Sequence, residues 1–384
     1  MGAERGADRR GLGRARVSGA PRVLVSGVVL DQPMGGVRRH NAELLPRAAE
    51  LLSDAGGELI LMEGKAPIAF ELPDKVRVLK SDVPSSPAPV RASFEGRALR
   101  SALEMEEAAE RPVDLVHLGH LPAPRSLPIP HTHTIHDLRM LTGEHTPMSR
   151  RLVSRHVIGA AVTKAARVIT VSEFVKRALV EEFGAAEEAV CVVPNGCDHL
   201  PVLDRAEGGG FILSVGHLEP RKNVKLLLEA LAQDDALGEL ILVGAPKGRE
   251  RELMEALALK LGVKGRVRFA GVVSDAELSE LYSRCSACVF PSKLEGFGIG
   301  VAEAMRAGAP VAIARGTAMD EVAAECCVEF DPEDPADCAR ALHSALAMTP
   351  KALEAARERS SAFSWDASAR LLVDTWLAAA GALA

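Results

Sequence analysis

The chain has 384 residues, of which 47% are hydrophobic and 26% are charged, and its formal net charge is −6. One hydrophobic core seldom grows beyond about 250–300 residues, so this length predicts two or three domains. The composition is typical of a soluble globular protein, and the negative charge argues against general nucleic-acid binding, which needs a basic surface. No stretch approaches the ~18 consecutive apolar residues of a membrane span.

Residues 1–20 carry five arginines among glycines and alanines and contain no apolar run. We expect a disordered basic lead-in rather than a secretory signal, and contact with anionic lipid stays an open alternative for it. The seven cysteines are an odd number, which favours reduced thiols in a cytosolic protein. Cys285 and Cys288 have the spacing of a redox or zinc pair, but no second pair follows, so we interpret them as packing residues.

From residue 21 onward, strand-like and helix-like segments alternate, which predicts mostly parallel sheets covered by helices. Strands are predicted at Val23–Val29, Leu59–Met62, Val76–Leu79, Leu115–Leu118, Thr132–Ile135, Val168–Val171 and Val190–Val193, with helices at Gly36–Leu52, 93–110, 149–165 and 173–183. The glycines at 208–210 predict a linker within Asp204–Gly210.

After this linker the alternation starts again. Strands are predicted at Phe211–Val215, Glu239–Val243, Val267–Phe269, Ala287–Phe290 and Pro310–Ala314, with helices at Val224–Gln233, 249–261, 275–284 and Val301–Arg306. The fold class is therefore α/β, with Rossmann-like domains at 21–203 and 204–364 and a final helical segment, 365–384, that crosses back to the first domain. Ligands of such sheets bind at the carboxyl ends of the strands, so we expect the site in the cleft between the domains.

The most informative stretch, residues 290–305, reads FPSKLEGFGIGVAEAM. A strand, a glycine-rich turn and a helix start leave backbone N–H groups free to bind an anion. Glu295 lies on the turn and Glu303 lies on the helix, and carboxylates accept hydrogen bonds from hydroxyl groups rather than from phosphates. The pattern indicates a ligand that carries both phosphate and sugar hydroxyls.

A second glycine-containing turn, Gly216 to Asn223, follows the first strand of the second domain. It places Arg221 and Lys222 at the start of the next helix, where cations are unfavourable unless an anion lies nearby. Two cations together with helix N–H groups suit a diphosphate leaving group. Gly35 and Gly36, between the first strand and helix, offer another close approach of backbone to phosphate.

Dinucleotide and triphosphate sites are not favoured. The glycines at 296, 298 and 300 superficially resemble a dinucleotide fingerprint, but Val301 stands where the third glycine is needed, and no Walker motif occurs. His131 and His133 share one strand face, yet we expect no zinc site there.

Several segments in order resemble the GT-B glycosyltransferases of family 4, from about residue 22 to residue 365. They are Glu295 with Glu303, Gly216 with Arg221-Lys222-Asn223, 169–174 (ITVSEF), 193–196 (VPNG), 307–311 (AGAPV) and 331–335 (DPEDP). The motif Thr134-Ile-His-Asp-Leu138 is similar to the family's strand-end histidine motif. Gly300 stands where the family often has proline.

The resemblance implies a retaining transferase with two Rossmann-like domains that face each other across a cleft and a donor bound mostly by the second one. It implies that Arg221 and Lys222 hold the departing diphosphate and that His136 lies beside the transferred sugar. Glu295 would contact sugar hydroxyls and Glu303 the nucleotide ribose. Donor binding would also involve the backbone at Gly35, Gly36, Gly216, Phe297 and Gly298.

The expected activity is therefore the transfer of a hexose from a GDP- or UDP-linked sugar to a glycan or lipid-linked acceptor, in surface polysaccharide or glycolipid synthesis. No Asp-x-Asp pair occurs, so we expect no metal and no cofactor, and we favour front-face attack. The expected location is the cytoplasm, with the inner membrane face as an open alternative. A non-catalytic GT-B relative that binds a glycan or a partner protein is the main alternative, and an epimerase or phosphorylase is less favoured.

Overall fold

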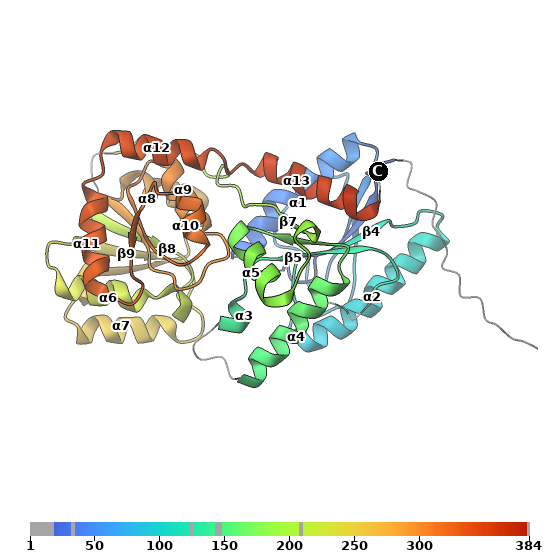
Figure 1. Ribbon diagram of the computed structural model, residues 1–384, viewed down its shortest axis with the longest axis horizontal. Helices are drawn as coiled ribbons and strands as arrows, with labels where there is room; N and C mark the ends of the chain where they lie inside the picture. Colours follow the sequence, from blue (N-terminus) through green and yellow to red (C-terminus); the bar gives the residue numbers. More distant parts are fainter. Residues whose placement is uncertain are drawn as a thin grey trace, which may run out of the picture.

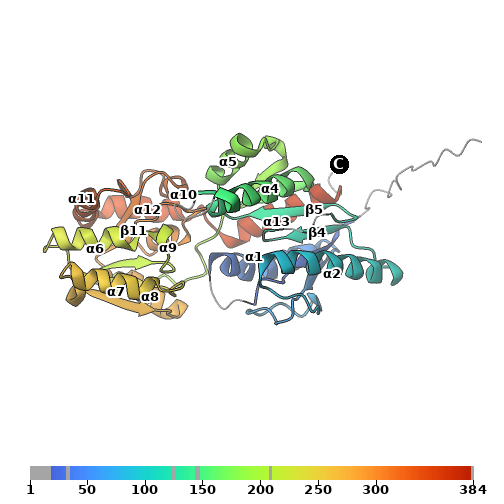
Figure 2. The same ribbon diagram turned by 90° about the horizontal axis from the view of Figure 1, so that it is seen from below.

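The computed structural model describes residues 19–31, 35–122, 124, 126–142, 148–206 and 210–381, so most of the predicted lead-in and part of the predicted linker lie outside it. Two parallel sheets, each with helices packed against it, form two domains that lie side by side (Figures 1 and 2). The α/β class with two Rossmann-like domains is confirmed. Within the described residues, no helix is both long and apolar enough to cross a membrane.

The first domain is built on a seven-stranded sheet with the order β3-β2-β1-β4-β5-β6-β7. Its strands are β1 (Arg22–Ser26), β2 (Glu58–Met62), β3 (Arg77–Leu79), β4 (Leu115–Leu118), β5 (His131–Ile135), β6 (Arg167–Thr170) and β7 (Val190–Val192). Its helices are α1 (Gly36–Asp54), α2 (Ala88–Ala108), α3 (Arg139–Thr142), α4 (Met148–Lys164) and α5 (Glu173–Phe183).

Alternate residues of these strands enter different cores, as the two-residue period of a strand requires. Val23 and Val25 of β1 pack in the cluster with α1, whereas Leu24 between them packs with Leu99 of α2 on the other face. The central strands are buried on both faces, which is typical of a parallel sheet.

The second domain is built on a six-stranded sheet with the order β10-β9-β8-β11-β12-β13. Its strands are β8 (Phe211–Val215), β9 (Glu239–Val243), β10 (Val267–Gly271), β11 (Ala287–Phe290), β12 (Val311–Ala314) and β13 (Val328–Phe330). Its helices are α6 (Val224–Gln233), α7 (Glu250–Lys260), α8 (Asp275–Arg284), α9 (Ile299–Arg306), α10 (Ala318–Ala323), α11 (Pro335–Leu346) and α12 (Pro350–Ser360). Cys285 and Cys288 are fully buried in its core.

Several predicted boundaries were wrong. Strand β1 ends at Ser26 rather than at residue 29, because residues 28–30 form a turn closed by the hydrogen bond from Leu30 N to Gly27 O. Helix α2 begins five residues before the predicted start, and Pro89 fits its first turn because no intrahelical N–H partner is needed there. Helix α9 begins two residues early, after Gly298 in the left-handed conformation.

Four elements between residues 315 and 360 were not predicted at all. β13 has only three residues and α10 only six, too few for a clear periodic signal. Helices α11 and α12 are longer, and each starts after a side-chain cap followed by proline, at Asp334 and Thr349. These start signals were readable in the sequence.

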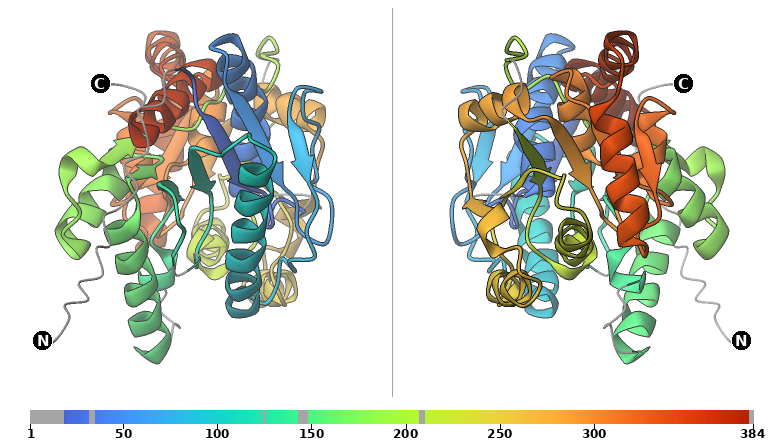
Figure 3. Two further views of the ribbon diagram at one scale, coloured as in Figure 1. Left: turned by 90° about the vertical axis from the view of Figure 1, so that its right-hand side faces the viewer. Right: turned by 90° about the vertical axis from the view of Figure 1, so that its left-hand side faces the viewer.

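The last helix, α13 (Trp365–Ala380), leaves the second domain and packs along α1 of the first (Figure 1). Trp365 and Trp376 are fully buried in the same core cluster as Val23 and Leu44. In the end-on views, the red residues of the C-terminal helices lie next to the blue residues of α1 (Figure 3). The chain therefore passes between the domains twice, once after β7 and once before α13.

Candidate active site

A cavity of about 310 Å³ lies between the two domains, bounded by segments that follow strands of both sheets. It is lined by every residue that the sequence singled out, namely His136, Arg221, Lys222, Glu295, Gly35, Gly36, Gly216, Phe297, Gly298 and Glu303. The structure thus brings residues from positions 35 to 303 to one place. What each of them does in the cavity stays a prediction.

Glu295 is the centre of the charge cluster on the second domain's side. It forms ion pairs with Lys222 and with Arg221, whose Nη1 lies 3.1 Å from Oε2, and Ser292 also hydrogen-bonds to it. Burial alone would raise the pKa of the Glu295 carboxyl, but the two cations outweigh burial and lower the pKa to about 2. Glu295 is therefore an ionised hydrogen-bond acceptor at neutral pH.

The two cations come from a single turn of 3₁₀ helix, Pro220–Lys222, directly before α6. Two hydrogen bonds hold this turn in place: Lys293 N donates to Arg221 O at 2.9 Å, and Arg221 Nη1 donates to Leu294 O at 2.9 Å. Arg221 also pairs with Glu219 at 2.6 Å. The turn between β8 and α6 is thereby joined to the glycine-rich turn after β11.

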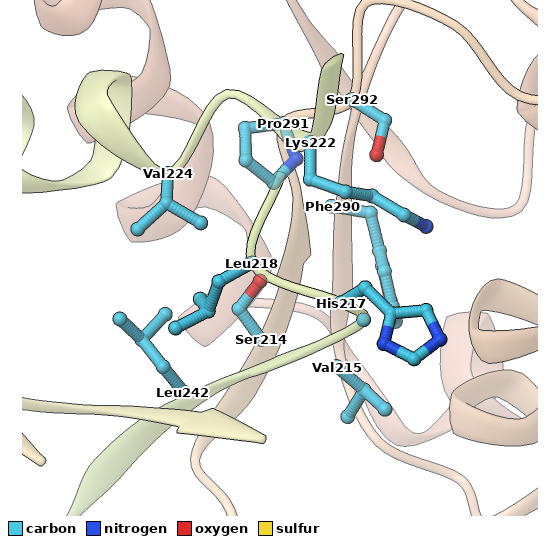
Figure 4. Close-up of a pocket in the computed structure, with 11 residues that line it drawn as sticks. Ser214, Val215, His217, Leu218, Lys222, Val224, Leu242, Phe290, Pro291 and Ser292 are labelled. Atoms are coloured by element: carbon cyan, nitrogen blue, oxygen red, sulfur yellow. The ribbon is translucent and has the colours of Figure 1, made fainter. Parts of the chain in front are cut away.

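A smaller pocket with polar and apolar side chains lies beside this cluster. In the close-up, Lys222, Ser292 and His217 lie on one side, whereas Leu218, Val224 and Leu242 lie on the other (Figure 4). Lys222 reaches this place because Gly216 has no side chain: a Cβ there would lie 3.2 Å from Lys222 Cε and Nζ. The conformation of Gly216, with φ of 154°, also favours glycine.

Glu303 is held by partners on both of its oxygens. Tyr282 Oη donates to Oε2 at 2.8 Å, and His199 Nε2 lies 3.1 Å from Oε1. The Glu303 residue is 8% exposed, and it faces the cavity from the second turn of α9. Both glutamates of the glycine-rich motif therefore line the same cavity, but only Glu295 pairs with lysine or arginine at ion-pair distance within the described residues.

The first domain's side of the cavity is formed by His136, directly after β5. Burial lowers the pKa of His136 well below its usual value, and the neighbouring His40 and Arg139 add to this effect. Its ring hydrogen-bonds to the Gly119 backbone, and its Nε2 has no hydrogen-bond partner among the described residues. Neutral His136 therefore donates through Nδ1 and offers Nε2 as an acceptor.

A second buried histidine supports the first. The ring of His40 meets that of His136 edge to face, with centroids 4.7 Å apart, and its Nδ1 lies 2.8 Å from Oδ1 of Asn195. Burial lowers the pKa of His40 to about 4, against the hydrogen bond to Asn195, which raises it. His136 thus rests on neutral, fully buried groups.

The two domains touch at the edge of the cavity. Gly296 approaches the first domain so closely that a Cβ there would lie 1.8 Å from the His136 carbonyl oxygen. The Gly296 carbonyl accepts a hydrogen bond from Ser172 Oγ at 2.7 Å. On another side, Arg39 Nη1 donates to Asp275 Oδ2 at 2.8 Å. Gly296 therefore serves the contact between the domains as well as the turn.

Several residues of the site were missed. His199, Tyr282, His40, Asn195, Arg39, Asp275, His217 and Glu219 contact or line the cavity, yet no role was predicted for them. Asn195 lies in the 193–196 motif, which was a readable signal, whereas the others depend on contacts between distant segments. Within the described residues, no three His, Cys, Asp or Glu side chains are grouped to hold a metal ion.

Comparisons with known proteins agree with this arrangement. The model of the family Glycosyltransferase Family 4 matches residues 34–199, and that of Glycosyl transferases group 1 matches residues 199–361. A D-inositol 3-phosphate glycosyltransferase of Geodermatophilus obscurus is 32% identical over 332 residues, which cover 75% of this chain and 72% of the relative. The chain belongs to the GT-B glycosyltransferases of family 4, and it is a glycosyltransferase.

Other relatives are more distant. The O-antigen chain mannosyltransferase B of Escherichia coli is 28% identical over 217 residues, which cover 52% of this chain and 57% of that relative. Sucrose-phosphate synthase of Thermosynechococcus elongatus has a similar structure, with a TM-score of 0.73 at 22% identity over 93% of this chain and 98% of that chain. Anabaena HepE in complex with UDP-glucose has a TM-score of 0.70 at 19% identity over 93% of this chain and 100% of that chain. These structures confirm the GT-B fold.

Proposed function

We propose that this glycosyltransferase moves a hexose, with retention of anomeric configuration, from a GDP- or UDP-linked sugar to a glycan or lipid-linked acceptor. The observation that carries the proposal is the pair of cations, Arg221 and Lys222, held at the cavity by Glu295. Cleavage of the donor leaves new negative charge on the diphosphate. Cations fixed in advance stabilise that charge without a cost of reorganisation in the transition state.

Glu295 supports a positioning role for the sugar hydroxyls. A carboxylate paired with two cations and with a pKa of about 2 carries no proton to donate, and its charge is too well neutralised for a strong nucleophile. It can still accept hydrogen bonds from hydroxyl groups. We therefore favour front-face attack, in which the acceptor hydroxyl gives its proton to the departing phosphate.

His136 completes this assignment from the first domain. Its unpartnered Nε2 is an acceptor, so it suits a hydroxyl of the transferred sugar rather than a phosphate oxygen. A neutral imidazole also places no positive charge beside a sugar that becomes oxocarbenium-like in the transition state. We assign the diphosphate to Arg221 and Lys222, and Arg39 and Arg139 of the first domain also line the cavity.

The class of acceptor is inferred from a relative. The O-antigen mannosyltransferase of Escherichia coli is named for a cell-surface polysaccharide, and we infer an acceptor of that class in surface polysaccharide or glycolipid synthesis. Such acceptors are assembled on membranes, so we also infer a cytoplasmic protein that works at the inner membrane face.

The test is release of nucleoside diphosphate from GDP-mannose, UDP-glucose and UDP-galactose in the presence of EDTA. We expect slow hydrolysis of one donor and loss of that activity in Lys222→Ala. NMR should find the anomeric proton of the freshly released sugar equatorial, as it is in these α-linked donors. Release that requires added Mg²⁺ or Mn²⁺ would contradict metal independence. An inverted product would contradict retention, and no binding of any donor by calorimetry would contradict the transferase proposal as a whole.

A further inference from the structure

The two connections between the domains run side by side next to the cavity. Residues 193–199, which follow β7, and residues 361–365, which lead into α13, form what we call the junction. Cys197 N donates to Phe363 O at 3.0 Å, and Trp365 N donates to Asp198 Oδ1 at 2.9 Å. A Cβ at Gly196 would lie 2.5 Å from Trp365 N, so the two segments of the junction are in direct contact.

His199 stands at the end of the junction, between Trp365 and Glu303. Its side chain is 3% exposed, Trp365 Nε1 lies 3.1 Å from its Nδ1, and Glu303 Oε1 lies 3.1 Å from its Nε2. An indole N–H can only donate, so Nδ1 must accept. The proton of a neutral His199 ring is therefore on Nε2, the nitrogen that faces Glu303.

His199 Nε2 lies 3.1 Å from Glu303 Oε1, but its N–H direction does not meet the geometry of a full hydrogen bond. The other oxygen of Glu303 is better held, since Tyr282 Oη donates to it at 2.8 Å within a fully buried setting. The orientation of the carboxylate thus depends on one residue of the second domain's α8 and one residue of the junction. Without His199, rotation of the carboxylate about the bond to Tyr282 is less restricted.

The same junction also serves the opposite wall of the cavity. Asn195 holds His40, and the His40 ring packs edge to face on His136. One stretch of five residues therefore contacts the support of His136 and the carboxylate of Glu303. The junction can therefore hold the His136 side and the Glu303 side of the cavity in a fixed relative position.

We propose that His199 is a positioning residue of the donor site: fixed by Trp365, it presents its Nε2–H to Glu303 and orients that carboxylate toward the nucleotide ribose. This inference rests on the proposed function and on the expectation, from the family resemblance, that Glu303 binds the hydroxyls of the nucleotide ribose. It makes the place where α13 joins the first domain part of the donor site. The proposal predicts that His199 controls the ratio of the affinities for ribose and deoxyribose nucleotides, a ratio that a purely structural residue would not change.

The experiment measures binding by calorimetry of GDP and UDP, and of their 2′-deoxy and 3′-deoxy forms, to the full chain and to variants. For the base that binds tighter, the wild type should bind the ribose form about tenfold more tightly than at least one deoxy form, as expected for a hydrogen bond to a charged group. His199→Leu should reduce this ratio to less than about threefold. His199→Gln should keep most of it, because its amide can accept from Trp365 and donate to Glu303.

A pair of tryptophan variants separates positioning from stability. Trp365→Phe removes the N–H that fixes His199, whereas Trp376→Phe alters an equally buried tryptophan of α13 whose Nε1 has no hydrogen-bond partner among the described residues. Both should lower the melting temperature, but only Trp365→Phe should reduce the ribose-to-deoxyribose ratio.

The outcomes are distinguishable. If the wild type binds neither GDP nor UDP, the proposed function fails and this inference fails with it. If the wild type discriminates and His199→Leu, folded by circular dichroism, discriminates equally well, the inference alone is overturned. An equal loss of discrimination in Trp365→Phe and Trp376→Phe would also overturn it, since the effect would then follow stability.

Discussion

The two walls of the cleft use opposite electrostatic solutions. In the first domain's wall, burial keeps the imidazoles of His136 and His40 uncharged, and Arg39 and Arg139 line the cavity beside them. The second domain's wall is made of paired charges, in which Glu295 is ionised between Arg221 and Lys222. The walls therefore differ in their buried groups: one buries neutral imidazoles, and the other holds a carboxylate between two cations.

The same contrast predicts how the walls respond to acid. Four buried histidines of the first domain, His40, His117, His133 and His136, have pKa values lowered by burial, to about 4 for His40 and about 3 for His117. Such groups bind a proton in the unfolded chain before they do so in the folded one. Their contribution to stability is therefore complete above pH 6.5 and is lost as the pH falls below it. Glu295 responds in the same direction but at lower pH: it keeps its contribution down to about pH 4.5 and loses it as the pH falls further toward the folded-state pKa of about 2.

The largest expected effect is a loss of stability between pH 7 and pH 5. At pH 5, about 1.5 pH units below the pKa of about 6.5 in the unfolded chain, each buried histidine should have lowered the free energy of unfolding by about 2 kcal/mol. The measurement is the free energy of urea unfolding at half-unit steps of pH. His117→Gln should reduce the slope of the free energy of unfolding against pH by an amount that corresponds to about one bound proton. His156→Gln, at an exposed position, should leave this slope unchanged. A wild-type slope near zero would contradict burial of the imidazoles in neutral form.

Removal of a cation from the charged wall comes next. Lys222→Ala should lower kcat by about 10²–10³, the scale for loss of one preorganised group that stabilises transition-state charge. Lys225→Ala is the matched control, because Lys225 lies in α6, its side chain is 62% exposed, and among the described residues its ion pair is with Glu229 of the same helix. Equal activity of the two variants would contradict a role of Lys222 in the reaction.

Replacement in the neutral wall should have a smaller effect. His136→Ala loses one uncharged hydrogen bond to a sugar hydroxyl, so kcat/KM should fall about tenfold. Because the pKa of His136 lies well below its usual value, His136 should cause no inflection in the wild-type pH profile of kcat/KM between pH 6 and 8. His131→Gln, at the first residue of β5 and outside the cavity lining, is the control. An inflection near pH 6.5 that His136→Ala removes would show that the wall is charged at the lower pH.

The sequence was a better guide to the charged wall than to the neutral one. Arg221, Lys222, Glu295 and Glu303 lie in short turns beside strands, so local pattern and chemistry were enough to place them in one site. His40 and Asn195 are 155 positions apart, and only the packing of α1 against the junction brings them together. The fold was predictable through regular alternation of apolar segments. It was missed between residues 315 and 360, where β13 and α10 are short and the cap signals of α11 and α12 were overlooked.

The smallest expected effect tests the one ion pair described here that joins the walls directly across the cleft. Arg39 of α1 pairs with Asp275 of α8, but their side chains are 25% and 47% exposed, so solvent and salt screen the attraction. Such a pair contributes about 0–1 kcal/mol, and Arg39→Ala should raise KM for the donor by less than about fivefold without a change in kcat. The double variant Arg39→Ala with Asp275→Ala should differ little from either single variant if the pair acts as a unit. Additive losses would mean that Arg39 contacts the donor itself, and the first domain would then supply a cation to the diphosphate.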